Sequence, residues 1–310
     1  MKLFLSLIML FAILILAFSY YAYRITFYMP KRPQTDGYAL ASDKAPEKIN
    51  PEVRKLSERM MANSFEPVTI TSFDGSGLFG RYYHVQDGAP VQLQFHGYKS
   101  SPFIDMIGGN YMARIMGHNS IAVDQRSHGM SDGNTITFGI NERRDVLFWI
   151  AYVNKRFGED TPIILSGLSM GAATVLMAAD LGLPANVKGI IADCPYSTPK
   201  DIILKTSADR KYPPRLTYPF VKLGARIFGH FNLEETDAVL AVQKARIPIL
   251  LIHGENDNFV PCDMSRKIAA ACASPITFVT FPGAGHGRSY LVDSKRYEKE
   301  LRTFIDSLPK

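Results

Sequence analysis

The sequence is poor in cysteine and has no familiar metal or nucleotide motif. Its three cysteines, Cys194, Cys262 and Cys272, are an odd number without a Cys-x-x-Cys pair, so they indicate neither a disulfide framework nor a zinc site. There is no His-Glu-x-x-His sequence, and the glycines form neither G-x-G-x-x-G nor a P-loop. We therefore expect no metal and no nucleotide cofactor.

Excess charge is scarce outside the N-terminal region. The formal net charge is +6, and residues 1–65 hold nine Lys/Arg against five Asp/Glu, so the remainder is nearly neutral. A nucleic-acid-binding protein needs a basic face on its folded domain. We expect no nucleic-acid partner, and interpret the basic residues as the flank of a membrane segment.

A long apolar run is present at the start of the chain. Residues 3–22 carry no charge, and about 20 such residues in a helix span the hydrocarbon core of a bilayer. Tyrosines and basic residues follow, which suits a membrane interface. The alternative is a signal peptide cleaved after Ala17-Phe18-Ser19 and a secreted body, but the run is long for a signal. We expect residues 1–30 to be a single-pass anchor, with either side of the membrane open for the body.

Residues 31–65 separate this run from the rest of the chain. Residues 31–46 are rich in Pro, Asp, Gly, Ala and Ser and indicate a linker. Apolar residues, among them Leu56 and Met60, recur at helical spacing over residues 47–63. This spacing predicts a short amphipathic helix that packs on the body or on the membrane surface.

From residue 66 onward, strand-type runs alternate with helical patterns. Residues 67–73 and 78–85 flank Asp74-Gly75-Ser76-Gly77, which predicts a hairpin. Later strands are expected at residues 91–95, 120–124, 162–166, 187–193, 247–253 and 276–281, and helices at 103–116, 141–157 and 289–308. Such alternation predicts an α/β fold, with a mostly parallel sheet covered on both faces and the hairpin as an antiparallel edge.

Residues 195–237 interrupt this alternation, because they hold no clear strand and are broken at Pro213-Pro214 and Pro219. An insertion of this length in a compact domain is usually functional. We expect helices that form a lid, since ligands bind at the carboxyl ends of the strands in such sheets. The alternative is a helical excursion that only adds core.

The central motif follows the strand-type run that starts at Pro162. It reads Gly167-Leu168-Ser169-Met170-Gly171, and an apolar helix-type segment comes next. On a strand–turn–helix, G-x-S-x-G exposes a nucleophilic serine hydroxyl, and a Cβ at either glycine would crowd the strand or the helix. The pattern favours Ser169 as a nucleophile over a plain turn.

A serine nucleophile needs a base, and the base needs an orienting acid. His286 stands in a glycine-rich loop after the last strand, and Asp257 stands in the loop after the preceding one. The order Ser, Asp, His suits this architecture. Asp193, at the end of the strand after the elbow helix, is the rival acid. Glu255 is expected to be solvated or structural, and His253 and His96 to make loop hydrogen bonds.

These motifs, in order at strand ends, resemble those of the α/β-hydrolase superfamily, in its lid-bearing esterase, lipase and aminopeptidase-like branch. The resemblance covers the chain from about residue 67 and implies a catalytic domain over 66–310 with a lid at about 195–237. It also implies two backbone N–H donors for an oxyanion, those of Tyr98 after His96-Gly97 and of Met170 after the nucleophile.

Residues 124–133 resemble the family's D-x-R-G-H-G-x-S turn, with Ser127 in the place of a glycine. In the family this segment braces the active-site loops through buried polar contacts. The resemblance therefore implies a structural role here, while Ser127 leaves the geometry of the turn open.

Together the resemblance and the anchor imply a serine hydrolase that cleaves carboxylic esters, with a medium-chain or lipid-derived acyl group, through Ser169, His286 and Asp257. A prolyl or aminopeptidase-type serine peptidase shares this triad, but Asp209, Glu234 and Glu235 are too scattered for an amine clamp. A silent, membrane-tethered binding protein is disfavoured by the intact triad. The sequence gives no indication of oligomeric state.

Overall fold

The computed structural model describes residues 1–30 and 51–309 of the 310-residue chain. The predicted linker and the first residues of the helix predicted after it lie outside this part. One eight-stranded sheet forms the centre of the body, in the order β1-β2-β4-β3-β5-β6-β7-β8. Its strands are β1 (Glu66–Thr71), β2 (Gly77–Tyr83), β3 (Val91–Phe95), β4 (Asn119–Val123), β5 (Ile163–Leu168), β6 (Val187–Asp193), β7 (Ile249–Gly254) and β8 (Ile276–Phe281).

The pairing confirms the predicted α/β fold. Strands β4, β3, β5, β6, β7 and β8 pair in parallel. The β1–β2 hairpin adds an antiparallel edge, because β2 also pairs antiparallel with β4. Gly75 takes a φ of +84° in the hairpin turn, a conformation that glycine adopts without steric cost.

Helices fill the connections between strands. They are α1 (Lys2–Thr26), α3 (Pro51–Ala62), α4 (Pro102–Asp105), α5 (Ile107–Ile115), α6 (Glu142–Phe157), α7 (Met170–Met177), α8 (Pro199–Asp209), α9 (Pro214–Ile227), α10 (Ala238–Val242), α11 (Cys262–Ala271), α12 (Ser289–Val292) and α13 (Ser294–Asp306). Two predicted helices are each divided, at Met106 and at Asp293. The Asp293 carboxylate accepts the Arg296 N–H at 3.0 Å, which caps α13 and explains that break.

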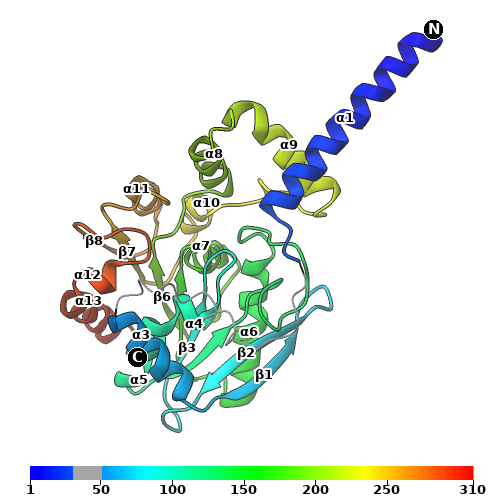
Figure 1. The fold of residues 1–310 in the computed structure, drawn as a ribbon. Coiled ribbons are helices and arrows are strands. Elements are labelled where there is room, and N and C mark those ends of the chain that lie inside the picture. The colour runs from blue at the N-terminus through cyan, green and yellow to red at the C-terminus, as the bar shows by residue number, and fades with distance from the viewer. Residues whose placement is uncertain (31–50, 310) are drawn as a thin grey trace.

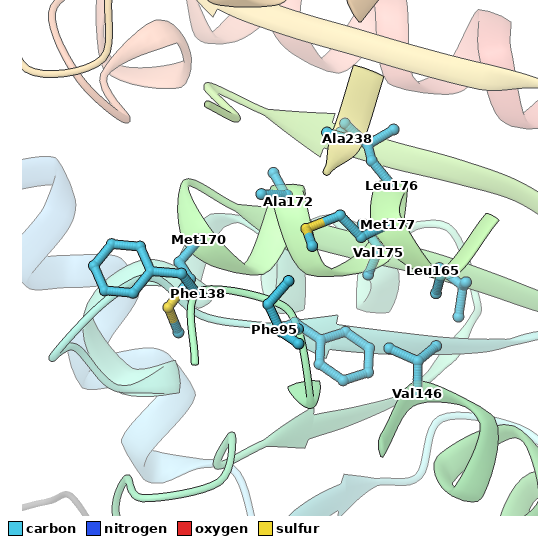
Figure 2. Close-up of a cluster of buried hydrophobic side chains, with 14 of the residues drawn as sticks. Phe95, Phe138, Val146, Leu165, Met170, Ala172, Val175, Leu176, Met177 and Ala238 are labelled. Carbon is cyan, nitrogen blue, oxygen red and sulfur yellow. The ribbon is translucent and has the colours of Figure 1, made fainter. Parts of the chain in front are cut away.

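Two apolar layers cover the sheet, because successive strand residues face opposite sides. Ile163 and Leu165 face the core that contains α6 and α7, whereas Ile164 faces the core that contains α5 and α13. Figure 2 shows Val175 and Leu176 of α7 within the first core. The elbow helix is thus buried along its length, which fixes the position of the residue that precedes it.

Helix α3 packs on the body rather than away from it. Leu56 and Met60 are buried in a cluster with Tyr83, Phe103 and Ile107. Of the two surfaces expected for this amphipathic helix, the structure therefore uses the catalytic body.

Helix α1 projects from the body along most of its length (Figure 1). It has the length and composition to cross a membrane, a test that a signal sequence near the N-terminus also passes. Its last turns are different: Ala22 and Tyr23 are buried, and Phe27 just beyond the helix is fully buried. Met29 N–H then donates to Asn134 O at 2.8 Å. The end of α1 is therefore part of the core.

Helices α8 and α9 occupy the stretch expected to form a lid; α9 lies beside the base of α1, and α8 packs against α9 (Figure 1). Helix α9 meets α1 at Gly224, where an added Cβ would lie 2.4 Å from the Ser19 carbonyl oxygen. Aromatic rings extend this contact, with Phe18 against Phe220 at 5.8 Å and Tyr20 against Phe228 at 5.1 Å.

Candidate active site

Ser169 sits on a sharp turn between β5 and α7, with φ +55° and ψ −114°. A Cβ on Gly167 would lie 2.3 Å from the Gly171 carbonyl carbon, and one on Gly171 would lie 1.9 Å from Phe95 O. Both distances are far shorter than a carbon contact allows. The steric reason expected for the two glycines is confirmed. Ser169 itself has a positive φ, which is strained for a non-glycine residue and is typical of functional turns.

The structure brings Ser169, His286 and Asp257 into one hydrogen-bonded row. His286 Nε2 lies 2.9 Å from Ser169 Oγ, and His286 Nδ1 lies 2.7 Å from Asp257 Oδ2. A carboxylate accepts only, so Nδ1 carries the proton and Nε2 is free to accept from the serine hydroxyl. This geometry can transfer the serine proton to the imidazole.

Asp257 is buried and strongly held. Its Oδ1 accepts the N–H groups of Phe259 and Val260 at 2.9 and 2.8 Å. Burial alone would raise the pKa of Asp257, but hydrogen bonds from His253, His286 and the Val260 N–H outweigh it and hold that pKa well below its usual range. The carboxylate is therefore ionised wherever the enzyme is folded at neutral pH.

His253 makes loop hydrogen bonds, as expected, and also contacts the acid. Its Nε2 lies 2.8 Å from Val260 O and 3.3 Å from Asp257 Oδ2, while its Nδ1 lies 2.6 Å from Ser265 Oγ. It is fully buried. The contact with Asp257 has no motif in the sequence, since it depends on how the loop after β7 folds back.

The two rival acids lie elsewhere. Tyr297 OH donates to Asp193 Oδ2 at 3.0 Å, and within the described residues Asp193 Oδ1 has no hydrogen-bond partner. Burial raises the pKa of Asp193 to about 6. Glu255 is exposed and accepts from Thr280 Oγ1 at 2.6 Å. The structure thus aligns Asp257 with His286 by a hydrogen bond.

Two backbone N–H groups are candidates for binding an oxyanion. Met170 opens α7, so its N–H has no acceptor within the helix. The loop after β3 lies against the serine, since a Cβ on Gly97 would be 3.4 Å from Ser169 Cβ. Tyr98 follows directly and lines the pocket that reaches Ser169.

Asp105 is a positioning residue that the sequence did not reveal. Its Oδ2 accepts the Gly97 N–H at 2.7 Å and so fixes the loop that carries Tyr98. The aspartate lies in α4, at the break that divides the helix predicted over residues 103–116. No pattern in the sequence distinguishes it from a surface acid.

His96 shapes the same loop, as expected. Its Nδ1 donates to Gly97 O at 2.8 Å, and its Nε2 accepts the Gln125 N–H at 3.1 Å. Burial lowers the pKa of His96 to about 4. A neutral imidazole whose two ring nitrogens are both hydrogen-bonded acts as a structural brace.

The segment around Ser127 also braces the site. Ser127 takes the left-handed conformation, with φ +67°, and its hydroxyl donates to Thr135 O at 2.9 Å. His128 Nε2 accepts the Lys99 N–H at 3.0 Å, and Asp124 pairs with buried Arg81 at 2.8 Å. The turn therefore keeps a glycine-type conformation with a serine in place.

A pocket of about 500 Å³ leads to Ser169. Its walls come from α1, from α8 and α9, and from the loops after β3, β6 and β7. The apolar side chains on it are Phe18, Ala22, Ile25, Phe138, Ile202, Ile203, Phe220, Val221, Phe259 and Val260. The Phe259 ring also packs edge-on against His286 at 5.0 Å.

One group of side chains near Ser169 has metal-ligand types. Ligand atoms of Cys194, Asp257 and His286 lie within 4.8 Å of one another. Burial raises the pKa of the Cys194 thiol well above its usual value, whereas a metal binds the thiolate. His286 and Asp257 already bond to each other, so we interpret this group as close packing around the row of hydrogen bonds.

Residues 95–299 match the family model described as "Alpha/beta hydrolase family". The chain belongs to this family. It is similar to the Bacillus subtilis protein YqkD, with 23% identity over 251 residues that cover 79% of this chain and 82% of the relative. It is also similar to a lysophosphatidylserine lipase, ABHD12, of Danio rerio, with 22% identity over 71% of this chain and 59% of that protein.

Solved structures agree with this assignment. The Pyrococcus furiosus esterase Pf2001 superposes with a TM-score of 0.68 at 20% identity, covering 91% of this chain and 99% of the esterase. At this identity the likeness concerns the fold. With the family match it confirms the α/β-hydrolase fold, and the family and its relatives support hydrolase activity on small molecules in a general sense.

Proposed function

We propose that this protein is a membrane-anchored serine hydrolase that cleaves carboxylic esters. The observation that carries the proposal is a row of two hydrogen bonds. Ser169 Oγ lies 2.9 Å from His286 Nε2, and His286 Nδ1 lies 2.7 Å from Asp257 Oδ2. Hydrogen bonds of this length connect a nucleophile, a base and an orienting acid.

In this proposal Ser169 Oγ attacks the ester carbonyl carbon while its proton passes to His286 Nε2. Asp257 keeps the imidazole oriented and stabilises its positive charge. The N–H groups of Tyr98 and Met170 bind the oxyanion, a contribution of about 3 kcal/mol per donor in comparable sites. His286 then protonates the departing alcohol, and a water deprotonated by His286 releases the acid from Ser169.

The pocket supports an apolar acyl group as the part of the substrate that is recognised. Its volume of about 500 Å³ falls in the range of roughly 300–1,000 Å³ that holds drug-sized ligands. The lining is mainly aliphatic and aromatic. A medium-chain or lipid-derived ester fits this chemistry, and the printed name of the ABHD12 relative, a lipase, agrees with it.

We further propose that residues 1–30 stay attached as the anchor, that 31–65 connect it, and that 66–310 form the catalytic domain with α8 and α9 as its lid. The core contacts of Ala22, Tyr23 and Phe27 support an uncleaved helix. The same contacts place the residues that follow the apolar run within the core of the body. The boundary proposed at residue 30 therefore follows the sequence pattern and does not separate two packed units.

The peptidase alternative is weakened by the acids near the pocket, since a peptide amine needs a carboxylate to pair with. The Asp209 carboxylate pairs with Lys205 at 2.6 Å. Glu234 pairs with Lys222 and accepts from Tyr218, and Glu235 pairs with Arg144 at 2.6 Å.

The test is ester hydrolysis by the full chain in detergent micelles, with p-nitrophenyl esters from acetate to palmitate. We expect activity that rises beyond acetate, and Ser169→Ala to lower kcat by at least about 10³-fold. Ser166→Ala, in the strand β5 that leads to Ser169, is the matched control and should keep activity within about twofold. Substantial hydrolysis by Ser169→Ala would overturn the proposal.

A further inference from the structure

The pocket that reaches Ser169 has a wall made by the apolar N-terminal helix. Phe18, Tyr21, Ala22, Ile25 and Thr26 of α1 line it. Residues of α8 and α9 line the same pocket. The helix that has the length to cross a membrane is therefore also part of the cavity in which the substrate would bind.

The free part of α1 is slightly too short to span a bilayer by itself. Nearly all large apolar side chains from Leu3 to Phe18 are exposed, and, apart from the Phe18 ring that contacts Phe220, packing on the body begins at Ser19. Residues 2–18 extend about 25 Å at about 1.5 Å per residue, against about 30 Å for the hydrocarbon core. The hydrocarbon boundary must therefore reach Tyr20 and Tyr21, which are 48% and 56% exposed.

Tyr21 is at once a boundary residue and a pocket residue. Tyrosine favours the headgroup level of a membrane, and Tyr21 lines the pocket. Across from it stands Tyr212 in the α8–α9 loop, and the two hydroxyls interact. A bilayer boundary at the level of Tyr21 would therefore meet a wall of the pocket.

The α8–α9 loop and the first turn of α9, which holds Arg215 and Leu216, have a composition suited to that level. Tyr212 and Leu216 are 42% and 69% exposed, and Arg210, Lys211 and Arg215 around them are exposed cations. Exposed apolar side chains among basic residues are typical of surfaces that enter a membrane interface. In Figure 1 this loop lies on the side of the body from which α1 projects.

We propose that α1 is part of the substrate site, and that a long-chain acyl ester enters it from the adjoining leaflet, between α1 and the α8–α9 loop. The acyl chain then lies against Phe18, Ala22 and Ile25, with its carbonyl at Ser169. This inference rests on the proposed esterase function and adds to it the source of the substrate and the role of α1.

The direct test compares one substitution at two places in the same helix. The full chain in lipid nanodiscs is assayed with p-nitrophenyl acetate, which is water-soluble, and p-nitrophenyl palmitate, which resides in the bilayer. Ile25→Trp fills the pocket from the α1 side, and Ile13→Trp, on the exposed part of α1, is the matched control.

We expect Ile25→Trp to lower kcat/KM for palmitate at least about tenfold more than it lowers kcat/KM for acetate, since pocket contacts of this size discriminate substrates by roughly 10–200-fold. Ile13→Trp should change neither value. Phe18→Ala, at an exposed position that tolerates truncation, should lower the palmitate-to-acetate ratio at least about threefold.

The outcomes separate the two proposals. A wild-type chain that neither hydrolyses these esters nor reacts with a fluorophosphonate would contradict the esterase function itself. A wild type active on both esters, with an unchanged palmitate-to-acetate ratio in Ile25→Trp and Phe18→Ala, would overturn the role of α1 alone. Fluorophosphonate labelling of each variant reports folding, and if Ile25→Trp loses it, the ratio in Phe18→Ala decides.

Discussion

Asp257 and Asp193 show how two buried carboxylates at neighbouring strand ends acquire different properties. Asp257 receives two backbone N–H groups and two imidazoles, which favour its ionised form. Asp193 accepts a hydrogen bond from the Tyr297 hydroxyl. Burial has the larger effect on its pKa and favours its neutral form. Only a permanent anion stabilises an imidazolium, so Asp257 is suited to be the acid.

Replacing each aspartate by asparagine tests this assignment. We expect Asp257→Asn to lower kcat about 10³–10⁴-fold, because an amide favours the wrong tautomer of His286. Asp193→Asn should lower it by no more than about tenfold. The measurement is kcat for one ester near pH 8, and a larger loss in Asp193→Asn would reverse the assignment.

The raised pKa of Asp193 also predicts a dependence of stability on pH. Its pKa is 3.8 in the reference state and about 6 in the folded chain. Between these values the unfolded chain loses the proton while the folded chain keeps it, so stability falls as pH rises, and above about pH 6 the penalty is constant. Asp193→Asn lacks this penalty.

The stability of Asp193→Asn relative to wild type should therefore increase by about 2 kcal/mol between about pH 4 and about pH 7. Denaturant unfolding of the full chain in mild detergent at several pH values measures it. A difference between the two chains that stays constant over this range would show that Asp193 is not protonated in the folded state.

Among single residues, the sequence predicted best those positions at which both the residue type and its spacing from a neighbour are required. Gly167 and Gly171 around Ser169 revealed the turn, because close backbone approach leaves no other residue type. Asp105 and the Asp257 contact of His253 were not predictable, since both depend on the path of a loop in space. The catalytic roles of Ser169, His286, Asp257, Tyr98 and Met170 stay predictions that the variants must test.

At the scale of elements, buried strands were the most predictable feature. The apolar runs at β3 and β6 gave those strands to the residue, because central parallel strands are buried on both faces. The run at β8 also matched its strand, although this edge strand is only partly buried. Helix α11 was not found, since its ten residues bury only a few side chains between exposed ones. The end of α1 was read as an interfacial flank, because no local pattern shows that Phe27 enters the core.

The α8–α9 loop and the first turn of α9, which holds Leu216, offer a prediction at this scale. The chain has one tryptophan, Trp149, which is fully buried. In nanodiscs with brominated acyl chains we expect the added fluorescence of Leu216→Trp to be quenched by about half or more, because the loop lies at the interface. Ile115→Trp, at the end of α5 and far from α1 in Figure 1, is the control and should keep its fluorescence. Equal emission from Leu216→Trp with and without bromine would contradict this position of the loop.

At the scale of the whole molecule, the end of helix α1 and the body are one packed unit. Tyr23, Phe27 and Met29 join the main hydrophobic core, and the preceding turns of α1 close the pocket. Removing residues 1–30 would therefore open the core and the site together, so every assay of substrate preference needs the intact chain.

The position of a covalent label tests the central claim most directly. The full chain in nanodiscs is treated with a fluorophosphonate, which phosphonylates activated serines, and digested for mass spectrometry. We expect one stoichiometric adduct, on Ser169, which is lost in Ser169→Ala and kept in Ser166→Ala. An unmodified Ser169, or a label that persists in Ser169→Ala, would contradict a serine hydrolase built on this turn.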